Sequence, residues 1–181
     1  MAEQHINPIH SSDTEKRSWF ALYTRPRHEM RVEKELQRLC IQAYLPCKEV
    51  IRQWSDRRKK LIVPIFPCYL FVHVNPKERI RSLGPPGVIK MLCFGGRPSR
   101  IPDAQIEAVR RVLEGGHDPI PAPYLKQGVA VEIISGPLLG LHGFIQRQHN
   151  TCRFIVSIEG ICQSISVQID GACLAPVDAR N

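Results

Sequence analysis

Cysteine and histidine are the side chains of this sequence that could act as nucleophiles or metal ligands. There are seven of each, and the cysteines are scattered singly with no CxxC pair. A structural zinc site needs four closely spaced thiolates or imidazoles, and an odd cysteine count without a signal peptide argues against a disulfide framework. We therefore expect reduced cysteines and neither a metal nor a cofactor.

Catalysis by a cysteine is the one enzymatic alternative. Cys68 would need His73 or His28 within hydrogen-bond reach as a base. Cys68 and His73 are an odd number of positions apart, so a straight strand places them on opposite faces. The sequence also contains no glycine-rich phosphate loop and no carboxylate pair. We expect no catalytic residue, and an activity lost in Cys68→Ser would reverse that expectation.

Basic residues recur at spacings of 4, 3 and 4 near the start of the chain, which is one face of a helix expected over residues 27–40: Arg27, Arg31, Lys34 and Arg38. The opposite face carries the apolar set expected to face the core, namely Val32, Leu36, Leu39 and Cys40. Arg25 and His28 adjoin the basic face, and residues 57–60 form a second basic cluster. Cations at this density attract phosphates without choosing a sequence.

The net charge of +8 is unevenly distributed. Residues 16–111 hold 21 Lys/Arg and 8 Asp/Glu, whereas residues 112–181 hold 4 and 6. This asymmetry indicates a first domain that faces nucleic acid and a second domain with a different partner. A charged surface that serves only solubility is the alternative.

An aromatic strand face is expected in residues 66–74, which read FPCYLFVHV. Alternation places Tyr69, Phe71 and His73 on one side and three aliphatic residues on the other. The aliphatic side should pack on helices, which leaves the aromatic side, with Tyr23 and Trp19, for a protein partner. The alternative is a sheet whose two faces are both buried in the core.

A glycine-rich segment at residues 126–148 carries the most specific pattern. Gly136, Gly140 and Gly143 are flanked by alternating valine and isoleucine residues, as in the KOW motif of small SH3-like barrels. Short β-branched runs at 129–134, 143–148, 153–159 and 164–170 predict an all-β domain around it.

The remaining pattern predicts an α+β fold of two domains. Strands at 19–25, 61–74 and 88–94 and helices at 27–40 and 102–114 suggest a small antiparallel sheet with helices, an α/β sandwich over residues 18–115. A polar leader covers 1–17, a proline-rich linker 116–125, and a β-barrel 126–179. With no secretory signal and no apolar run of about 20 residues, we expect a cytoplasmic protein without a membrane span.

Several motifs, in order, resemble the NusG family of transcription elongation factors over residues 18–178. They are WFALYTRPRHE at 19–29, FPCYLFV at 66–72, Gly87-Val88, FGGRP at 94–98 with Ile101-Pro102 after it, and the KOW segment. The chain looks most similar to the specialised RfaH, LoaP and UpxY types. The resemblance implies an N-terminal NGN domain and a C-terminal KOW barrel.

The resemblance also implies a set of binding residues. An aromatic pocket would dock on the β′ clamp helices of RNA polymerase through Tyr23, Phe66, Pro67, Tyr69 and Phe71. A short helix expected over residues 76–83 would approach the β gate loop through Arg79, Arg81 and Ser82. Non-template DNA near the upstream fork would lie against the basic region, to which Arg25, His28 and Arg31 correspond. Arg27, Lys34 and Arg38, from the helical spacing described above, complete the expected set of nucleic-acid-binding residues.

The barrel would recruit a ribosomal protein or Rho through Leu141, His142 and Phe144. Two positions depart from the family: Cys68 replaces a frequent glycine, and Leu141 replaces a larger aromatic residue of the housekeeping members. Some relatives fold this domain as an inhibitory helical hairpin, but the β-branched runs favour the barrel.

The expected function is therefore that of a monomeric, non-enzymatic antitermination factor that suppresses pausing and termination. The alternative is a KOW-type RNA-binding or ribosome-associated protein that does not contact polymerase. Charge reversal at Arg27, Arg31 and Lys34 would abolish binding in that alternative, whereas Tyr69→Ala would have little effect.

Overall fold

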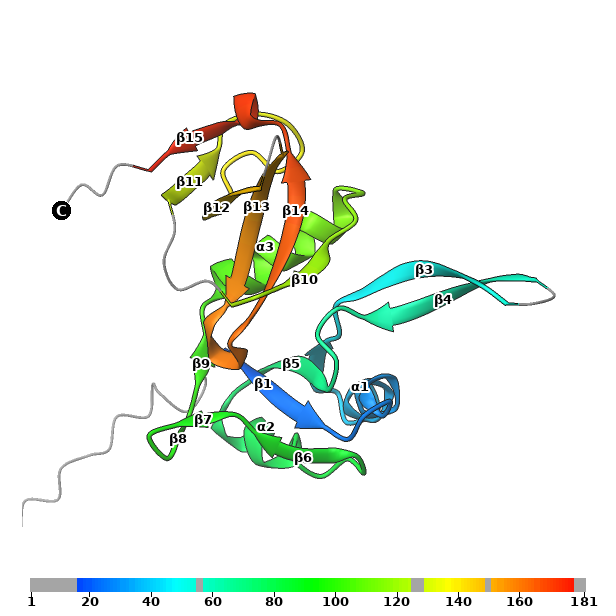
Figure 1. Cartoon of the computed structure of the whole chain (residues 1–181). Helices are drawn as coiled ribbons and strands as arrows, with labels where there is room; N and C mark the ends of the chain where they lie inside the picture. The colour runs from blue at the N-terminus through cyan, green and yellow to red at the C-terminus, as the bar shows by residue number, and fades with distance from the viewer. Residues whose placement is uncertain (1–15, 55–56, 125–128, 149–150, 178–181) are drawn as a thin grey trace, which may run out of the picture.

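The structure of the protein is a computed structural model that describes residues 16–54, 57–124, 129–148 and 151–177 (Figure 1). Most of the expected leader and the start of the KOW segment at 126–128 lie outside the described residues. The fold is α+β, as the sequence predicts, with an antiparallel N-terminal sheet and a second, all-β unit. Among the described residues, no helix combines the length and the apolar character needed to cross a membrane.

The N-terminal sheet is built around its first strand, β1 (Ser18–Thr24), which is apolar on both faces. The strand order is β2-β5-β1-β6, with the short β9 also paired to β1. All of these pairings are antiparallel. The other strands are β2 (Gln42–Tyr44), β5 (Tyr69–Val74), β6 (Val88–Met91) and β9 (Arg100–Ile101).

Helix α1 (Glu29–Arg38) covers the aliphatic face of this sheet. Val32 and Leu36 are buried against Leu70 and Val72 of β5, as predicted. The expectation that Leu39 and Cys40 complete this apolar face is wrong, because both side chains are exposed.

A Schellman turn explains this difference. The Cys40 N–H donates to the Gln37 carbonyl at 3.0 Å, and the Ile41 N–H donates to the Leu36 carbonyl at 2.9 Å. Cys40 takes the left-handed conformation (φ +55°) that this motif requires. The chain therefore leaves the helix earlier than expected, and Ile41 is the residue that packs in the core.

Two further helices follow. Helix α2 (Pro76–Arg81) starts with a capping box, in which the Asn75 side chain accepts from the Glu78 N–H at 2.9 Å. Helix α3 (Asp103–Glu114) buries Ile106 and Val109 as expected, whereas Val112 rather than Leu113 is fully buried. Between them, a small hairpin joins β7 (Cys93–Phe94) to β8 (Arg97–Pro98).

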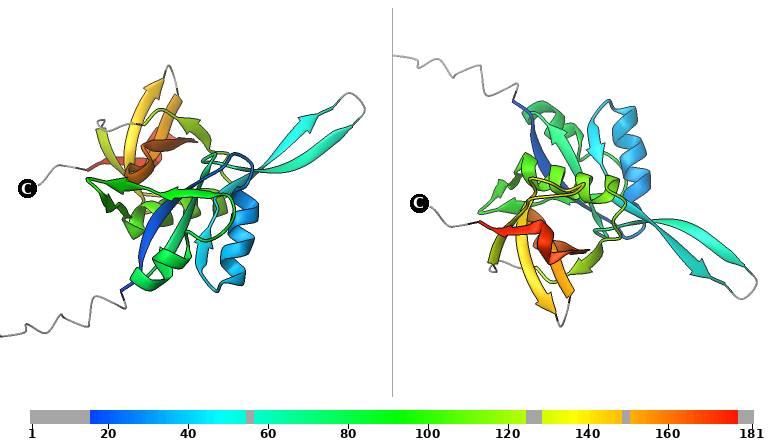
Figure 2. Two further views of the ribbon diagram at one scale, coloured as in Figure 1. Left: turned by 90° about the horizontal axis from the view of Figure 1, so that it is seen from below. Right: turned by 90° about the horizontal axis from the view of Figure 1, so that it is seen from above.

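A two-stranded ribbon projects from the N-terminal domain as an arm (Figures 1 and 2). It consists of β3 (Cys47–Gln53) and β4 (Arg58–Pro64), paired along their whole length. The single strand expected over residues 61–74 is therefore wrong. It is two strands, β4 and β5, which belong to different sheets and are separated at residues 65–68.

The C-terminal sheet has the order β10-β14-β13-β12-β11-β15, and all its pairings are antiparallel. Its strands are β10 (Ile120–Ala122), β11 (Val129–Ile133), β12 (His142–Gln148), β13 (Thr151–Ile158), β14 (Gln163–Ile169) and β15 (Leu174–Pro176). Strands β11 to β14 occur close to the four predicted runs, whereas β10 and β15 were not predicted. The short 3-10 helices η1 (Glu159–Ile161) and η2 (Gly171–Cys173) flank β14. We call this unit the barrel.

Strand β10 lies within the segment expected to be an irregular linker at 116–125. It pairs with β14 at the edge of the sheet, with Pro121 opposite Ile165. Proline is tolerated in an edge strand, because its missing N–H removes no interior hydrogen bond. Three prolines in eight residues therefore did not preclude a strand.

The two units share one hydrophobic core. A single cluster of buried side chains contains Trp19, Phe71 and Val109 of the N-terminal domain together with Ile158 and Ile161 of the barrel. Figure 2 shows the barrel lying against the N-terminal domain, over α3, with the outer end of the ribbon pointing away from it. This arrangement determines which predicted binding residues are accessible.

Candidate functional site

The aromatic face expected on the N-terminal sheet is present. β1 and β5 pair so that Trp19 is opposite His73, Ala21 is opposite Phe71 and Tyr23 is opposite Tyr69. The rings of Tyr23 and Tyr69 lie 5.3 Å apart, and the Trp19 ring stacks on His73 at 4.9 Å. These side chains are on the side of the sheet opposite α1, as alternation predicts.

Tyr44 and Phe66 extend this aromatic face. The Phe66 ring meets the Phe71 ring edge-on at 6.0 Å, and Tyr44 lies 6.5 Å from both Trp19 and Phe71. The Arg110 guanidinium from α3 sits 5.1 Å from the centre of the Tyr44 ring. Burial raises the pKa of Tyr44 to about 12, a shift that nearby Arg110 opposes.

Access to this face differs from the expectation. Phe66 and Phe71 are 1% and 0% exposed, so neither can meet a partner in this arrangement. Tyr23 and Tyr69 remain half-buried, and Pro67 is exposed. The alternative of a two-sided core therefore holds for Phe66 and Phe71, because the barrel belongs to the same hydrophobic cluster.

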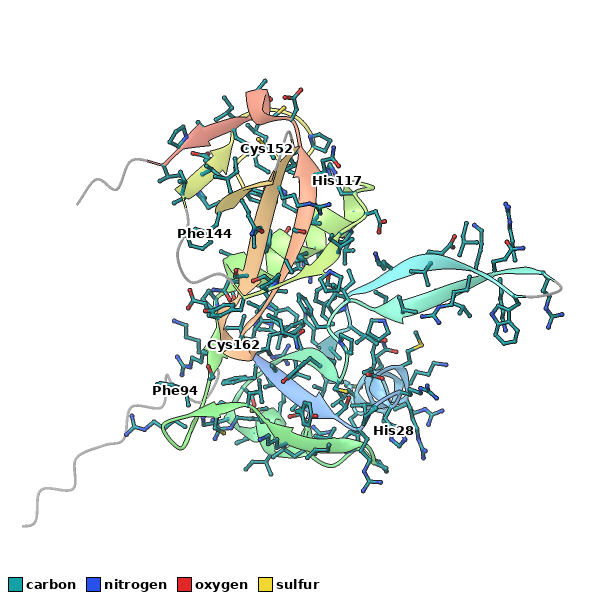
Figure 3. The ribbon with its side chains drawn as sticks, viewed as in Figure 1. His28, Phe94, His117, Phe144, Cys152 and Cys162 are labelled. Carbon is teal, nitrogen blue, oxygen red and sulfur yellow. The ribbon has the colours of Figure 1, made fainter. Side chains whose placement is uncertain are left out.

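The barrel is held on the N-terminal domain by contacts with α3 and β9. The Glu159 N–H of η1 donates to Gln105 Oε1 at 3.1 Å, and Arg111 Nη2 donates to the Leu139 carbonyl at 2.6 Å. A Cβ at Gly160 would lie 3.1 Å from Ile101 Cγ1, which shows how closely η1 approaches β9. Cys162, labelled in Figure 3, lies at this junction.

A second set of contacts ties down the segment between the domains. Lys48 Nζ, at the base of the ribbon, donates to Asp118 Oδ1 at 2.7 Å and to the Pro119 carbonyl at 2.9 Å. Elsewhere the interface is incompletely packed, because a cleft of about 420 Å³ separates α3 from the barrel, lined by residues that include Gln105 and Phe144. The barrel is thus docked by a few polar contacts and one apolar patch.

Cys68 occupies a strained turn rather than a catalytic site. Its φ is +67°, and its N–H donates to Glu29 Oε1 at 2.8 Å. Burial, with a further contribution from Glu29, raises the pKa of the Cys68 thiol. A thiol held in its protonated form is a poor nucleophile. No group of three potential metal ligands occurs among the described residues either.

The basic residues expected on the helix are exposed, but only Arg31, Lys34 and Arg38 lie on α1. The expectation that Arg27 belongs to the helix is wrong, because α1 starts at Glu29; Arg25 and Arg27 are exposed in the segment before it. Arg38 Nη1 pairs with Glu35 at 2.7 Å, so part of the charge is neutralised within the helix. Arg27 precedes the helix with a φ of +64°, and His28 is a half-buried N-cap whose ring lies against Gly87. Figure 3 shows His28 at the end of α1.

The residues expected near the β gate loop divide into two groups. Arg81 is exposed and donates to the Leu39 carbonyl at 3.1 Å, and Arg79 is half-buried. The expectation that Ser82 is available for contact is wrong. Ser82 is 0% exposed, and its hydroxyl donates to the Arg79 carbonyl at 2.7 Å, closing the end of α2.

Of the barrel residues expected to bind a partner, some are accessible and one is buried. Leu141 was expected to be an exposed contact, but it is buried in the core. The turn at Gly140, with a φ of +80°, directs Leu139 outward instead, where it is 56% exposed. His142 is exposed, and Phe144, labelled in Figure 3, lines the cleft beside α3.

The docking contacts of α3 were not predicted. Gln105 and Arg111 bind the barrel, but in the sequence they appear only as polar residues of an amphipathic helix. No sequence pattern distinguishes a polar residue that meets a second domain from one that meets solvent. The basic cluster at 57–60, in contrast, was visible, and the structure places its described members at the outer end of the ribbon.

An antiparallel sheet with an aromatic face and an adjoining small barrel defines a two-domain α+β protein. A family model described as "Transcription termination factor nusG" matches residues 17–110. The "Transcription termination/antitermination protein NusG" of Buchnera aphidicola subsp. Baizongia pistaciae (strain Bp) is 25% identical in an alignment of 175 residues that covers 86% of this chain and 93% of that protein.

A solved structure described as "Domain interaction in Thermotoga maritima NusG" has the same fold, with a TM-score of 0.52 and 20% identity over 91% of this chain and 99% of that chain. The protein belongs to the NusG family. It is a transcription termination/antitermination factor, and proteins of this family are not enzymes.

Proposed function

We propose that the protein binds RNA polymerase through the aromatic face of its N-terminal domain and suppresses pausing and termination. The docking residues would be Tyr23, Phe66, Pro67, Tyr69 and Phe71, and the ligand would be the β′ clamp helices. The exposed cations of α1 would hold non-template DNA near the upstream fork, and Arg79 and Arg81 would face the β gate loop. The barrel would recruit a further protein through His142 and Leu139.

The observation that carries this proposal is the composition of the aromatic face. The N-terminal domain places five aromatic rings, from Trp19, Tyr23, Tyr44, Tyr69 and Phe71, on the side of its sheet that α1 does not cover. Aromatic residues dominate the energetic centres of protein interfaces. A factor that shifts polymerase from its paused to its active conformation needs to change the free-energy difference between them by only a few kcal/mol. This is sufficient because about 1.4 kcal/mol changes a rate tenfold.

Binding of polymerase at this face requires the barrel to move away. Phe71 lies in a core that the barrel completes, so polymerase and barrel would compete for the same surface. The interface supports release, since its described polar contacts are few and a cleft of about 420 Å³ remains between α3 and the barrel. The free protein would therefore be less active than its detached N-terminal domain.

The first experiment measures polymerase binding and pause lifetimes with purified components. Tyr69→Ala should weaken binding at least tenfold, because Tyr69 is half-buried at the open edge of the face. Phe94→Ala is the matched control, since Phe94 is an aromatic residue that is 87% exposed on the separate β7–β8 hairpin. Equal binding by wild type and Tyr69→Ala would overturn the proposal.

A second experiment tests the covering barrel. A Cβ at Gly160 would lie 3.7 Å from Ser99 Oγ, which is compatible with a disulfide in a Ser99→Cys/Gly160→Cys variant. Oxidation should abolish polymerase binding and reduction should restore it, with the Gly160→Cys single variant as the control. Full binding by the oxidised double variant would show that the barrel need not leave.

An RNA-binding function without polymerase contact is the alternative that these experiments separate. It predicts that charge reversal at Arg27, Arg31 and Lys34 removes nucleic-acid binding while Tyr69→Ala has no effect. The polymerase proposal predicts that Tyr69→Ala prevents recruitment even when the basic face is intact.

A further inference from the structure

The β3–β4 ribbon carries a pair of like charges directly opposite each other. Arg52 on β3 is paired in register with Lys59 on β4, and both side chains are exposed on one face of the ribbon. Like charges at opposed positions of an antiparallel pair destabilise it. Neither cation has an acidic partner among the residues that the structure describes.

The neighbouring cations of the ribbon, Lys60 and Arg58, do have side-chain partners. Lys60 pairs with Glu49 at 2.8 Å, which raises the pKa of Lys60, and Arg58 Nε donates to Gln53 Oε1 at 3.0 Å. Both of these contacts are on the face opposite to Arg52 and Lys59. On one face of the ribbon Lys60 is therefore neutralised by Glu49 and Arg58 is hydrogen-bonded, whereas the other face carries two opposed cations with neither kind of partner among the described residues.

The ribbon also ends in an exposed indole. Trp54 follows β3 and is 52% exposed, whereas the only other tryptophan, Trp19, is 6% exposed in the core. A large aromatic side chain held in solvent marks an interaction surface, and the unpaired cations beside it attract the phosphates of a polyanion. The stability lost to the opposed cations would be recovered against a polyanion.

We propose that the outer part of the ribbon, formed by Arg52, Trp54 and Lys59, is a binding site for double-stranded DNA. Two antiparallel strands form an element that the B-DNA major groove, about 12 Å wide, can admit. Seven-residue strands extend about 23 Å, so the arm is long enough to reach a duplex beside the body of the protein. Double-stranded RNA fits less well, because its major groove is too narrow and deep for side chains to read.

This site is distinct from the basic face of α1 and adds a duplex contact to the proposed function. It does not depend on polymerase. The full-length protein is titrated against a fluorescein-labelled 20-base-pair DNA duplex at several salt concentrations, and anisotropy is recorded. The same titration is made with one strand alone and with an RNA duplex of the same sequence.

An Arg52→Ala/Lys59→Ala variant should bind the duplex about tenfold more weakly at low salt. Its salt slope should fall by about 2, because two phosphates would no longer be neutralised by the protein. A Lys77→Ala/Arg97→Ala variant is the matched control. It removes two exposed cations from α2 and β8, outside the ribbon, and should leave both the affinity and the slope unchanged.

Thermal unfolding distinguishes binding from a structural role. Because the opposed cations repel each other, Arg52→Ala/Lys59→Ala should be at least as stable as wild type while binding DNA more weakly. Trp54 emission should change on adding duplex, and Trp54→Phe should remove that change.

An unchanged duplex affinity and salt slope in Arg52→Ala/Lys59→Ala, or tighter binding of single-stranded DNA or duplex RNA through the same two cations, would overturn the proposal. The assay contains no polymerase, so that result would leave the aromatic docking face unaffected. Conversely, failure of Tyr69→Ala to weaken polymerase binding would leave the ribbon site unaffected.

Discussion

The carboxylate of Glu29 accepts a hydrogen bond from the backbone N–H of Cys68 at 2.8 Å, although the two residues are 39 positions apart. Glu29 is 5% exposed and begins α1, and Cys68 immediately precedes β5. The Thr24 N–H donates to the Cys68 carbonyl at 2.8 Å, which fixes the other side of the same peptide region. One buried carboxylate thus joins the basic helix to the start of the aromatic strand.

Glu29→Ala should destabilise the protein by about 1–3 kcal/mol, because the Cys68 N–H would be left without its acceptor. Glu29→Gln retains an acceptor oxygen and should lose less. Chemical denaturation of the two variants and wild type measures the difference. Equal stability of Glu29→Ala and wild type would show that the bond contributes nothing to the fold.

Cys68→Gly should stabilise the protein by about 1 kcal/mol. A residue with a side chain is strained at a φ of +67°, whereas glycine adopts this conformation freely. The N–H that binds Glu29 is retained. Cys68→Ala is the control, because it removes the sulfur and keeps the strained Cβ. If the alanine variant gained as much as the glycine variant, the strain would not be the cause.

Gly143→Ala should destabilise the barrel by about 2–3 kcal/mol or prevent its folding. An added Cβ would lie 2.6 Å from both the Ile155 carbonyl oxygen and Phe154 Cζ, and backbone on β13 cannot yield as a flexible side chain can. Gly136→Ala tests a positive φ without a clash, since nothing lies within 4 Å of its Cβ position. Thermal unfolding should therefore show the larger loss at Gly143.

Alkaline pH should destabilise the fold through Tyr44. Its pKa is raised from 10.0 to about 12 in the folded protein, so the unfolded chain ionises first. The stability contribution is complete below pH 10 and is lost as the pH rises to 12. Tyr44→Phe should flatten the stability profile over this window, and an unchanged profile would contradict the assignment.

Cys47 should resist alkylation near neutral pH. Burial first, and then the carboxylates of Glu33 and Glu29, raise the pKa of its thiol from 9.0 to about 11. At pH 8 about one thiol in a thousand would be ionised, and the thiolate is the reactive form. Mass spectrometry after iodoacetamide treatment should find exposed Cys93 modified well before Cys47. Equal rates would contradict the burial of Cys47.

The periodicity of apolar residues correctly predicted which side chains of a single helix or strand face the core. The alternation in β5 correctly separated Leu70 and Val72 from Tyr69 and Phe71, and helical spacing identified Val32 and Leu36 as core residues. These predictions succeed because each pattern is set by one local geometry and one apolar surface.

The differences arise where the result depends on a turn or on the second domain. Leu39 and Cys40 continue the helical spacing, but the Schellman hydrogen bonds turn the chain before they can pack. A turn also explains the error at Leu141. Because Gly140 takes a positive φ, the turn buries Leu141 and exposes Leu139, the reverse of the expectation. Burial of Phe71 required knowing where the barrel lies, which no local pattern contains.

The core shared by the two domains has an evolutionary consequence. Phe71 is as fully buried as Val109 or Ile158, so sequence comparison among homologues would classify it with ordinary structural positions. Substitutions there would be restricted by the fit to the barrel, whatever other surface the residue meets. Conservation scores alone would therefore not separate recognition residues from framework residues in this protein, and mutational scans that report stability and transcription separately would be needed.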